Sequence, residues 1–202
     1  MAVNADEKRS RIIEIAKRRF AHYGMAKTTM AEIAKDLSFS KALLYYYFPD
    51  KNSLYSAVLE NLIEESLETT KEAVEKTSTV LEGIHTILEV NMDFKKKYFN
   101  LMEYTIVMRK ELPAELEAIL IRSFERQQKI VEQVFRRGIE RGELKKVDTT
   151  EAARIFLFGT IGMRISLLKD FKNDFIPDKS EFDAILSMQK KLADIFVAGL
   201  KV

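Results

Sequence analysis

Residues 28–51 read TTMAEIAKDLSFSKALLYYYFPDK, and this stretch decides the fold of the N-terminal part of the chain. Apolar residues recur at helical spacing from Met30 to Leu37, which predicts a short helix with one buried stripe. Thr29 and Glu32 stand three positions apart at its start, the spacing of a capping box. The segment therefore predicts a helix that begins directly after Thr29.

A second short helix is predicted from Lys41 to about Tyr47, because Ser40 is a good N-cap. Leu44, Tyr47 and Phe48 follow helical spacing and are expected to face inward. Two short helices joined by a tight turn predict a helix-turn-helix, whose second helix enters the major groove of DNA. The hydroxyls, amines and small groups left on the outer face suit contacts with phosphates and thymine methyl groups.

Longer helices are predicted on both sides of this motif. The first runs from about Asp6 to Tyr23, and Gly24 suits the left-handed position that ends a helix. Its apolar face is expected to contain Ile12, Ala16, Phe20 and Tyr23. A fourth helix begins near Lys51 and continues to about Glu75.

The remaining chain predicts further long helices, because Gly and Pro are scarce and apolar residues keep helical spacing. Their approximate spans are 78–96, 98–110, 113–141, 149–170 and 179–200. The predicted class is all-α: an N-terminal three-helix helix-turn-helix head, residues 1–51, followed by a larger helical ligand-binding and dimerisation body, residues 52–202. The head holds ten Lys and Arg against six Asp and Glu, so it is the basic part that is expected to meet a polyanion.

Composition excludes several kinds of site. The chain has no Cys, and its two histidines, His22 and His85, lack a partner at metal-ligand spacing. We therefore expect no catalytic residues, no metal and no cofactor. No apolar run approaches the roughly 20 residues that cross a bilayer, and the charged N-terminus is unlike a secretory signal. A cytoplasmic protein without a membrane partner is expected.

The head resembles the tetracycline-repressor-like (TetR) family of regulators. The resemblance covers about residues 8–60, with the body similar in layout alone. The matching residues are Phe20, Gly24, Thr28, Thr29, Ile33, Ala34, Ser40, Lys41, Leu44, Tyr45, Tyr47, Phe48 and Lys51. The family likeness implies a DNA-binding transcriptional regulator, a repressor released from its operator by a small-molecule effector. It also implies a homodimer on a pseudo-palindromic double-stranded operator.

The resemblance also implies a role for each residue of the motif. Thr28 and Thr29 touch the DNA backbone, Ser40 and Lys41 anchor the recognition helix, and Lys51 binds phosphate. Nearest the bases are Ala42, Leu43 and Tyr46, while Tyr45 contacts a phosphate or a thymine.

This chain departs from the family pattern at two places. Ser38 stands where the family usually has a turn glycine, so either the turn differs or Ser38 carries backbone strain. Ala42 and Leu43 replace a small Gly-Thr pair, and this more hydrophobic face favours T-rich contacts as a hypothesis.

The body offers a candidate ligand pocket and a candidate dimer interface. Aromatic and Met side chains can wall an adaptable pocket, with ordinary core packing as the alternative. The pocket candidates are Phe94, Tyr98, Met102, Tyr104, Met108, Phe124 and Phe158. Apolar stripes on the last two helices predict a four-helix interface between two copies, with packing inside one chain as the alternative. The interface candidates are Phe156, Gly159, Gly162, Ile185, Leu192, Ile195 and Phe196.

Some alternatives stay open at this stage. Arg109, Arg122 and Arg164 either read an anionic ligand or are surface charges, and 95–97, a run of three lysines, is interpreted as a solvated helix end. A DNA-binding architectural or division protein that senses nothing, an all-helical enzyme, and an activator with the same fold are the rival functions.

Overall fold

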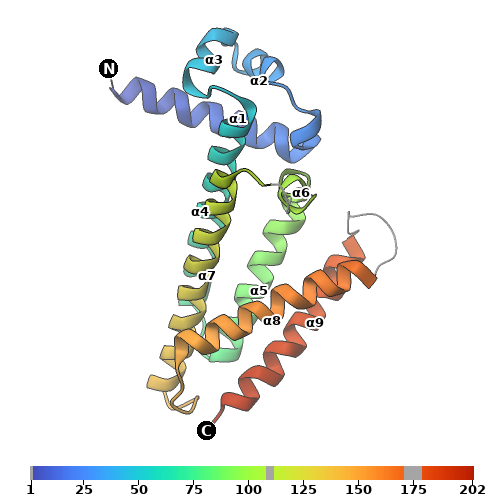
Figure 1. Ribbon diagram of the computed structural model, residues 1–202. Coiled ribbons are helices and arrows are strands. Elements are labelled where there is room, and N and C mark those ends of the chain that lie inside the picture. The colour runs from blue at the N-terminus through green and yellow to red at the C-terminus, as the bar shows by residue number, and fades with distance from the viewer. Residues whose placement is uncertain (1, 108–111, 171–178) are drawn as a thin grey trace. The chain divides into compact units, whose positions relative to one another are not determined.

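The computed structural model describes residues 2–107, 112–170 and 179–202, and these residues form a series of helices (Figure 1). The helices are α1 (Ala2–Lys27), α2 (Met30–Leu37), α3 (Lys41–Tyr47), α4 (Lys51–Glu75), α5 (Val80–Lys97), α6 (Phe99–Val107), α7 (Ala114–Glu140), α8 (Thr149–Asp170) and α9 (Lys179–Leu200). The all-α prediction is confirmed. None of the helices in the described part has the length and apolar character needed to span a membrane.

The chain divides into two compact units. The first comprises Met1–Glu65 with Lys97–Leu120, and the second comprises Ser66–Lys96 with Ile121–Val202. The division falls inside α4, so this helix contributes to both units. The sequence predicts that the DNA-binding head ends at residue 51, and the division into compact units does not test this boundary, which stays a prediction.

In the first unit α1 carries the central apolar stripe. Ile12, Ala16 and Phe20 are fully buried, as predicted. Tyr23 was expected on the same face, but 51% of its surface is exposed. The Cζ atom of Arg19 lies 5.5 Å from the centroid of the Tyr23 ring. The ring therefore contacts a guanidinium group instead of packing in the core. The expectation for Tyr23 was wrong.

Gly24 ends the first helical run of α1, as predicted, and a further short run follows it. Its backbone has φ 78° and ψ 167°, and the helix resumes on the far side and continues to Lys27. A residue with a Cβ is strained at this φ, so glycine permits the bend. The bend sets the direction in which the chain enters α2.

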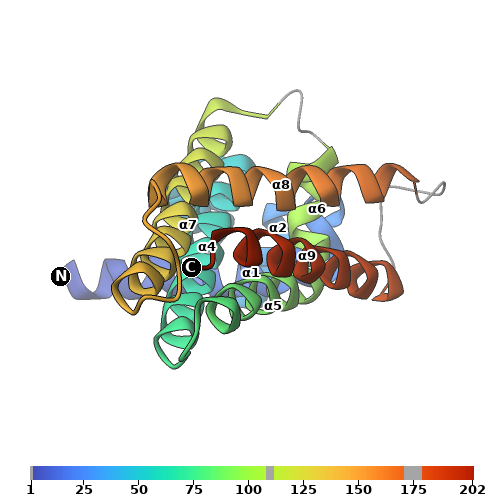
Figure 2. The same ribbon diagram turned by 90° about the horizontal axis from the view of Figure 1, so that it is seen from below.

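In the second unit an aromatic cluster joins three helices. Phe135 of α7, Phe156 of α8 and Phe196 of α9 have ring centroids 5.5 to 6.4 Å apart. α8 and α9 lie side by side, as both views show (Figure 2). This cluster forms part of the core of the unit.

Two predicted dimer-interface residues belong to that core. Phe156 and Ile185 are each only 1% exposed, so their side chains are not available to a second chain. The sequence could not separate the two faces of α8, because residues 155–158 are apolar on every side of the helix.

Candidate DNA-binding surface

The start of α2 is fixed by reciprocal hydrogen bonds. The backbone N–H of Thr29 donates to Glu32 Oε2 at 2.9 Å, and the N–H of Glu32 donates to Thr29 Oγ1 at 3.3 Å. The hydrogen bonds from the Thr29 hydroxyl and backbone hold the pKa of Glu32 below its usual range. The predicted capping box is confirmed. It satisfies backbone donors that the first turn of a helix otherwise leaves open.

The turn between α2 and α3 places Ser38 in the left-handed region, at φ 56° and ψ 35°. The Ser38 N–H donates to Lys35 O at 3.0 Å, and the Phe39 N–H donates to Ala34 O at 2.9 Å. These bonds close the end of α2 in the geometry that a glycine usually supplies. Of the two sequence-based alternatives, the structure has the strained serine rather than a different turn.

Replacing Ser38 with Gly is therefore expected to stabilise the protein by about 0.5–1 kcal/mol. Relief of the left-handed strain exceeds the entropy that glycine adds to the unfolded chain. Urea unfolding measures the difference. The comparison variant is Ser40→Gly, where φ is −67° and no strain exists to relieve, so loss of its N-cap hydrogen bond should make this variant slightly less stable. Equal stability of Ser38→Gly and the unaltered protein would contradict the strain argument.

α3 has a buried face and an exposed face. Leu44 is fully buried and Phe48 is 3% exposed, so both inward predictions are confirmed, whereas Tyr47 is half-buried. Ser40 caps the helix by accepting a hydrogen bond from the Leu43 N–H at 3.2 Å, as predicted. The opposite face carries exposed polar and apolar side chains. We call the set Lys41, Ala42, Tyr45 and Tyr46 the α3 outer face.

The two tyrosines of the α3 outer face are exposed to solvent. Tyr46 is 81% exposed and Tyr45 is 47% exposed. Lys41 stands in the first turn, where the positive end of the helix disfavours a cation unless an anion lies nearby. Leu43 is half-buried beside this face, and Thr29 is exposed at the start of α2. These groups can meet phosphates and base edges together.

Thr28 and Lys51 of the predicted contact set hydrogen-bond to backbone carbonyls of the head. Thr28 is fully buried, and its hydroxyl donates to Gly24 O at 2.8 Å, so its side chain cannot reach a phosphate. Lys51 Nζ donates to Met25 O at 3.0 Å and to Thr28 O at 3.1 Å. The expected contact of the Thr28 side chain was therefore wrong. Lys51 ties the start of α4 to the end of α1, which leaves one of its three N–H groups for a phosphate.

Sequence reasoning missed two arginines of α1. The Arg9 guanidinium lies 5.3 Å from the centroid of the Phe48 ring, and that of Arg11 lies 5.7 Å from the Phe39 ring. Phe39 and Phe48 flank α3 at its two ends, so a cation stands beside each end of the helix. The basic character of the first residues can be read from the sequence. Their place beside α3 depends on tertiary packing, which the sequence does not show.

The predicted ligand-pocket residues are divided between the two units. Tyr104 of the first unit packs edge-on against Tyr55, with ring centroids 5.2 Å apart. Phe124 of the second unit stacks on Phe158 at 5.3 Å, and Phe158 is 58% exposed. Met102 and Phe94 are half-buried, and Tyr98 is 7% exposed. Met108, like Arg109, lies outside the described residues. Phe158 does not line an enclosed space, which corrects its expected role.

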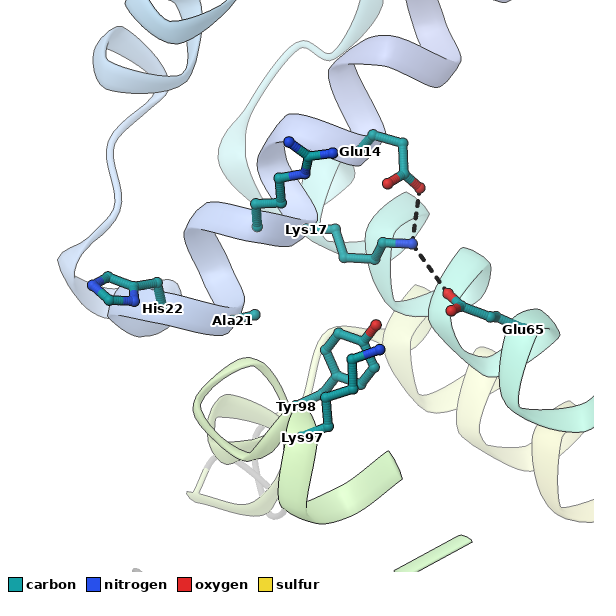
Figure 3. A pocket seen from close by; sticks show the side chains of 8 residues that line it. Glu14, Lys17, Ala21, His22, Glu65, Lys97 and Tyr98 are labelled. Carbon is teal, nitrogen blue, oxygen red and sulfur yellow. Dashed lines mark hydrogen bonds and ion pairs between the residues drawn. The ribbon is translucent and has the colours of Figure 1, made fainter. Parts of the chain in front are cut away.

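Tyr98 lines an open cleft of about 500 Å³ in the first unit (Figure 3). Lys17 of α1 reaches across it and pairs with Glu14 at 2.8 Å and with Glu65 of α4 at 3.1 Å. Although burial opposes it, hydrogen bonding to these carboxylates raises the pKa of Lys17. His22 and Lys97 also line the cleft. Its wall is mostly charged, unlike the aromatic pocket that the sequence suggested.

α8 and α9 leave large apolar side chains in solvent. The most exposed are Ile195 at 72%, Phe158 at 58% and Ile155 at 54%, with Met188 at 40%. Gly159 and Gly162 are exposed as well, while Leu192 and Phe196 are half-buried. We call the set Ile155, Phe158, Gly159, Gly162, Met188, Leu192 and Ile195 the α8–α9 apolar face. Several large apolar side chains exposed on two adjacent helices are typical of a protein interface.

Comparison with known proteins agrees with the head geometry. Residues 12–58 match the family model of bacterial regulatory proteins of the tetR family. Nucleoid occlusion factor SlmA of Mannheimia succiniciproducens is 32% identical over 37% of this chain, a match that spans only 34% of SlmA. The HTH-type transcriptional regulator YhgD of Bacillus subtilis is 25% identical over 90% of this chain and 94% of its own length.

A solved structure extends the likeness to the body. A transcriptional regulator from Cytophaga hutchinsonii ATCC 33406 is similar with a TM-score of 0.86 and 27% identity, covering 96% of this chain and 99% of its own. The helix-turn-helix and the full-length likeness agree. The head, residues 12–58, matches the tetR family of bacterial regulatory proteins, and the whole chain is similar to transcriptional regulators.

Proposed function

We propose that this chain is a sequence-specific repressor that binds a pseudo-palindromic operator as a homodimer in the cytoplasm and is released by a small-molecule effector. The observation that carries the proposal is the α3 outer face. It presents one amine and two exposed phenols on a helix whose other side is anchored in the core. A helix fixed in this way can enter a major groove without rearrangement.

The contacts divide by chemistry. Lys41, Ser40 and Thr29 suit phosphates, because amines and hydroxyls are the usual partners of the DNA backbone. Ala42, Leu43 and Tyr46 lie where they can meet base edges, and the apolar pair suits thymine methyl groups. Tyr45 contacts a phosphate or a thymine. Arg9 and Arg11 join the phosphate contacts from the two ends of α3.

Dimerisation would occur through the α8–α9 apolar face. Packed against the same face of a second copy, these helices form a four-helix interface related by a two-fold axis. The exposed glycines allow close approach between helices. A two-fold dimer presents two recognition helices to successive major grooves, which requires half-sites about 34 Å apart.

Release requires that the effector binds one conformation of the body better than another. α4 belongs to both compact units and begins directly after α3, so its movement would carry such a change to the recognition helix. The effector and the operator then weaken each other by the same factor. A chain that binds its operator but never responds to a ligand would act as an architectural protein instead.

The DNA contacts are tested by Lys41→Ala and Tyr45→Ala. Each is expected to weaken binding to a selected operator by about tenfold, and Lys41→Ala should lower the slope of affinity against salt by about one. Fluorescence anisotropy at several salt concentrations measures both quantities. The control is Tyr23→Ala, which removes a tyrosine that is 51% exposed but lies outside α3. If the control weakens binding as much as the α3 variants, α3 is not the reading helix.

A further inference from the structure

Arg19 of α1 contacts both carboxylates of α2, the first helix of the helix-turn-helix. Its Nε donates to Asp36 Oδ2, and its Nη2 donates to Asp36 Oδ1 at 3.1 Å. Its Nη1 lies 3.5 Å from Glu32 Oε1. A guanidinium that binds one carboxylate through two hydrogen bonds fixes the orientation of that carboxylate as well as its distance. Arg19 therefore helps to set how α2 lies on α1.

Glu32 extends this contact to the start of α2. Its Oε1 faces Arg19, while its Oε2 accepts hydrogen bonds from the Thr29 backbone N–H at 2.9 Å and from the Thr29 hydroxyl at 2.8 Å. Arg19, Glu32 and Thr29 are thus connected in series. Thr29 is one of the proposed phosphate contacts, so a displacement of Glu32 would also displace a group that is expected to meet DNA.

α2 passes its orientation on to the recognition helix. The two helices pack against each other, and the Phe39 N–H in the turn between them donates to Ala34 O of α2 at 2.9 Å. A rotation of α2 on α1 would therefore also rotate the α3 outer face. Contacts with base edges need hydrogen-bond geometry, which a small rotation is enough to lose.

Arg19 itself is poorly placed to touch DNA. Only 19% of its side chain is exposed, and each of its three nitrogens faces a carboxylate oxygen of α2. The hydrogen bond with Asp36 raises the pKa of Arg19 and holds the pKa of Asp36 below its usual range. Both partners are therefore charged at neutral pH, and the contact persists under the conditions of DNA binding.

We propose that Arg19 is a positioning residue for operator binding. By holding Asp36 and Glu32, it fixes the place at which Thr29 and the α3 outer face meet DNA, and it does so without touching DNA. This role rests on the proposed function, because it requires that the chain binds an operator. It adds a residue that lies outside the set of DNA contacts.

The test measures binding of a selected operator by Arg19→Gln in the full chain, using fluorescence anisotropy at several salt concentrations. Urea unfolding verifies that the variant is folded under the binding conditions. Affinity is expected to fall by at least about fivefold, with an unchanged salt slope because no phosphate contact is removed. Arg18→Gln is the matched control. It removes the same charge from an exposed neighbour that lines the cleft of Figure 3, and it should leave affinity unchanged.

Two further variants examine the route of the effect. Arg19→Lys keeps the positive charge but cannot bind Asp36 through a planar fork, so its affinity should resemble that of Arg19→Gln. The double variant of Arg19→Gln with Asp36→Asn should bind no more weakly than Arg19→Gln alone. Its second change removes a partner whose contact is already lost.

Three results would overturn the proposal. A folded Arg19→Gln that binds as tightly as Arg18→Gln would give Arg19 a structural role only. A salt slope that falls by about one would show that Arg19 contacts a phosphate itself. Full affinity in Arg19→Lys would show that charge alone matters. Each of these results leaves the repressor function intact, since the unaltered protein still binds its operator. An unaltered protein that binds no operator would contradict the repressor function and the role of Arg19 together.

Discussion

Ile195→Glu is expected to convert the protein into a monomer and to weaken operator binding by at least about 100-fold. Ile195 is 72% exposed within the α8–α9 apolar face, more than any other large apolar side chain of that set. In a dimer a carboxylate there would lose its water without gaining a partner. A monomer binds one half-site, and it loses the gain of about 10²–10⁴ that two linked sites provide.

Sedimentation equilibrium and anisotropy on the same samples measure the two effects. Lys129→Glu places the same carboxylate at an exposed polar position of α7 and should leave both properties unchanged. A dimer that persists in Ile195→Glu would show that α8 and α9 are not the interface. A monomer that still binds its operator tightly would show that dimerisation is not needed for recognition.

Lys95→Met is expected to make the protein more stable near neutral pH. The Lys95 pKa of about 7 lies well below the 10.5 of a free lysine side chain. The folded state then binds fewer protons than the unfolded state between these values, so stability rises with pH across that interval. Below pH 7 the amine is charged and its partial desolvation opposes folding, and towards pH 10 this opposition disappears.

The free energies of unfolding of the two proteins should therefore converge as pH rises. We expect the Met variant to be more stable by roughly 2 kcal/mol at pH 6, with the difference falling by at most about 1.4 kcal/mol per pH unit above pH 7. Urea unfolding at several pH values measures this difference. Arg164 is the other charged residue that lines the small cavity next to Lys95, between α5, α7, α8 and α9. A Met variant that is less stable at every pH would assign Lys95 a structural role.

The helix-turn-helix could be predicted from sequence because its signals are local. The capping pair Thr29 and Glu32, the cap Ser40 and the apolar spacing of α2 act over one or two turns, and each holds in the structure. Ser38 could be identified as a departure, but its conformation could not be chosen. That choice depends on how the whole turn closes.

The errors occurred where burial depends on neighbours far along the chain. Thr28 is hidden because α1 bends at Gly24, which no local pattern shows. Phe156 was expected at a dimer interface but lies in the core, and Phe158 was expected to line a pocket but lies on the surface. α8 is apolar around its circumference, so periodicity could not separate them.

The lysines of residues 95–97 share a charge but differ in environment. Lys95 and Lys96 are half-buried and Lys97 is exposed, because successive helical positions point in different directions. A run of like charges does not show this difference, since it depends on which side of α5 packs against the rest of the unit.

The most direct test of the central claim is selection of bound sequences from a random double-stranded DNA library by the purified protein. The account predicts a pseudo-palindromic consensus, with half-site centres about one helical turn apart, that Lys41→Ala and Tyr45→Ala bind more weakly. The absence of any consensus, with weak binding that depends steeply on salt for every sequence, would contradict a sequence-specific repressor.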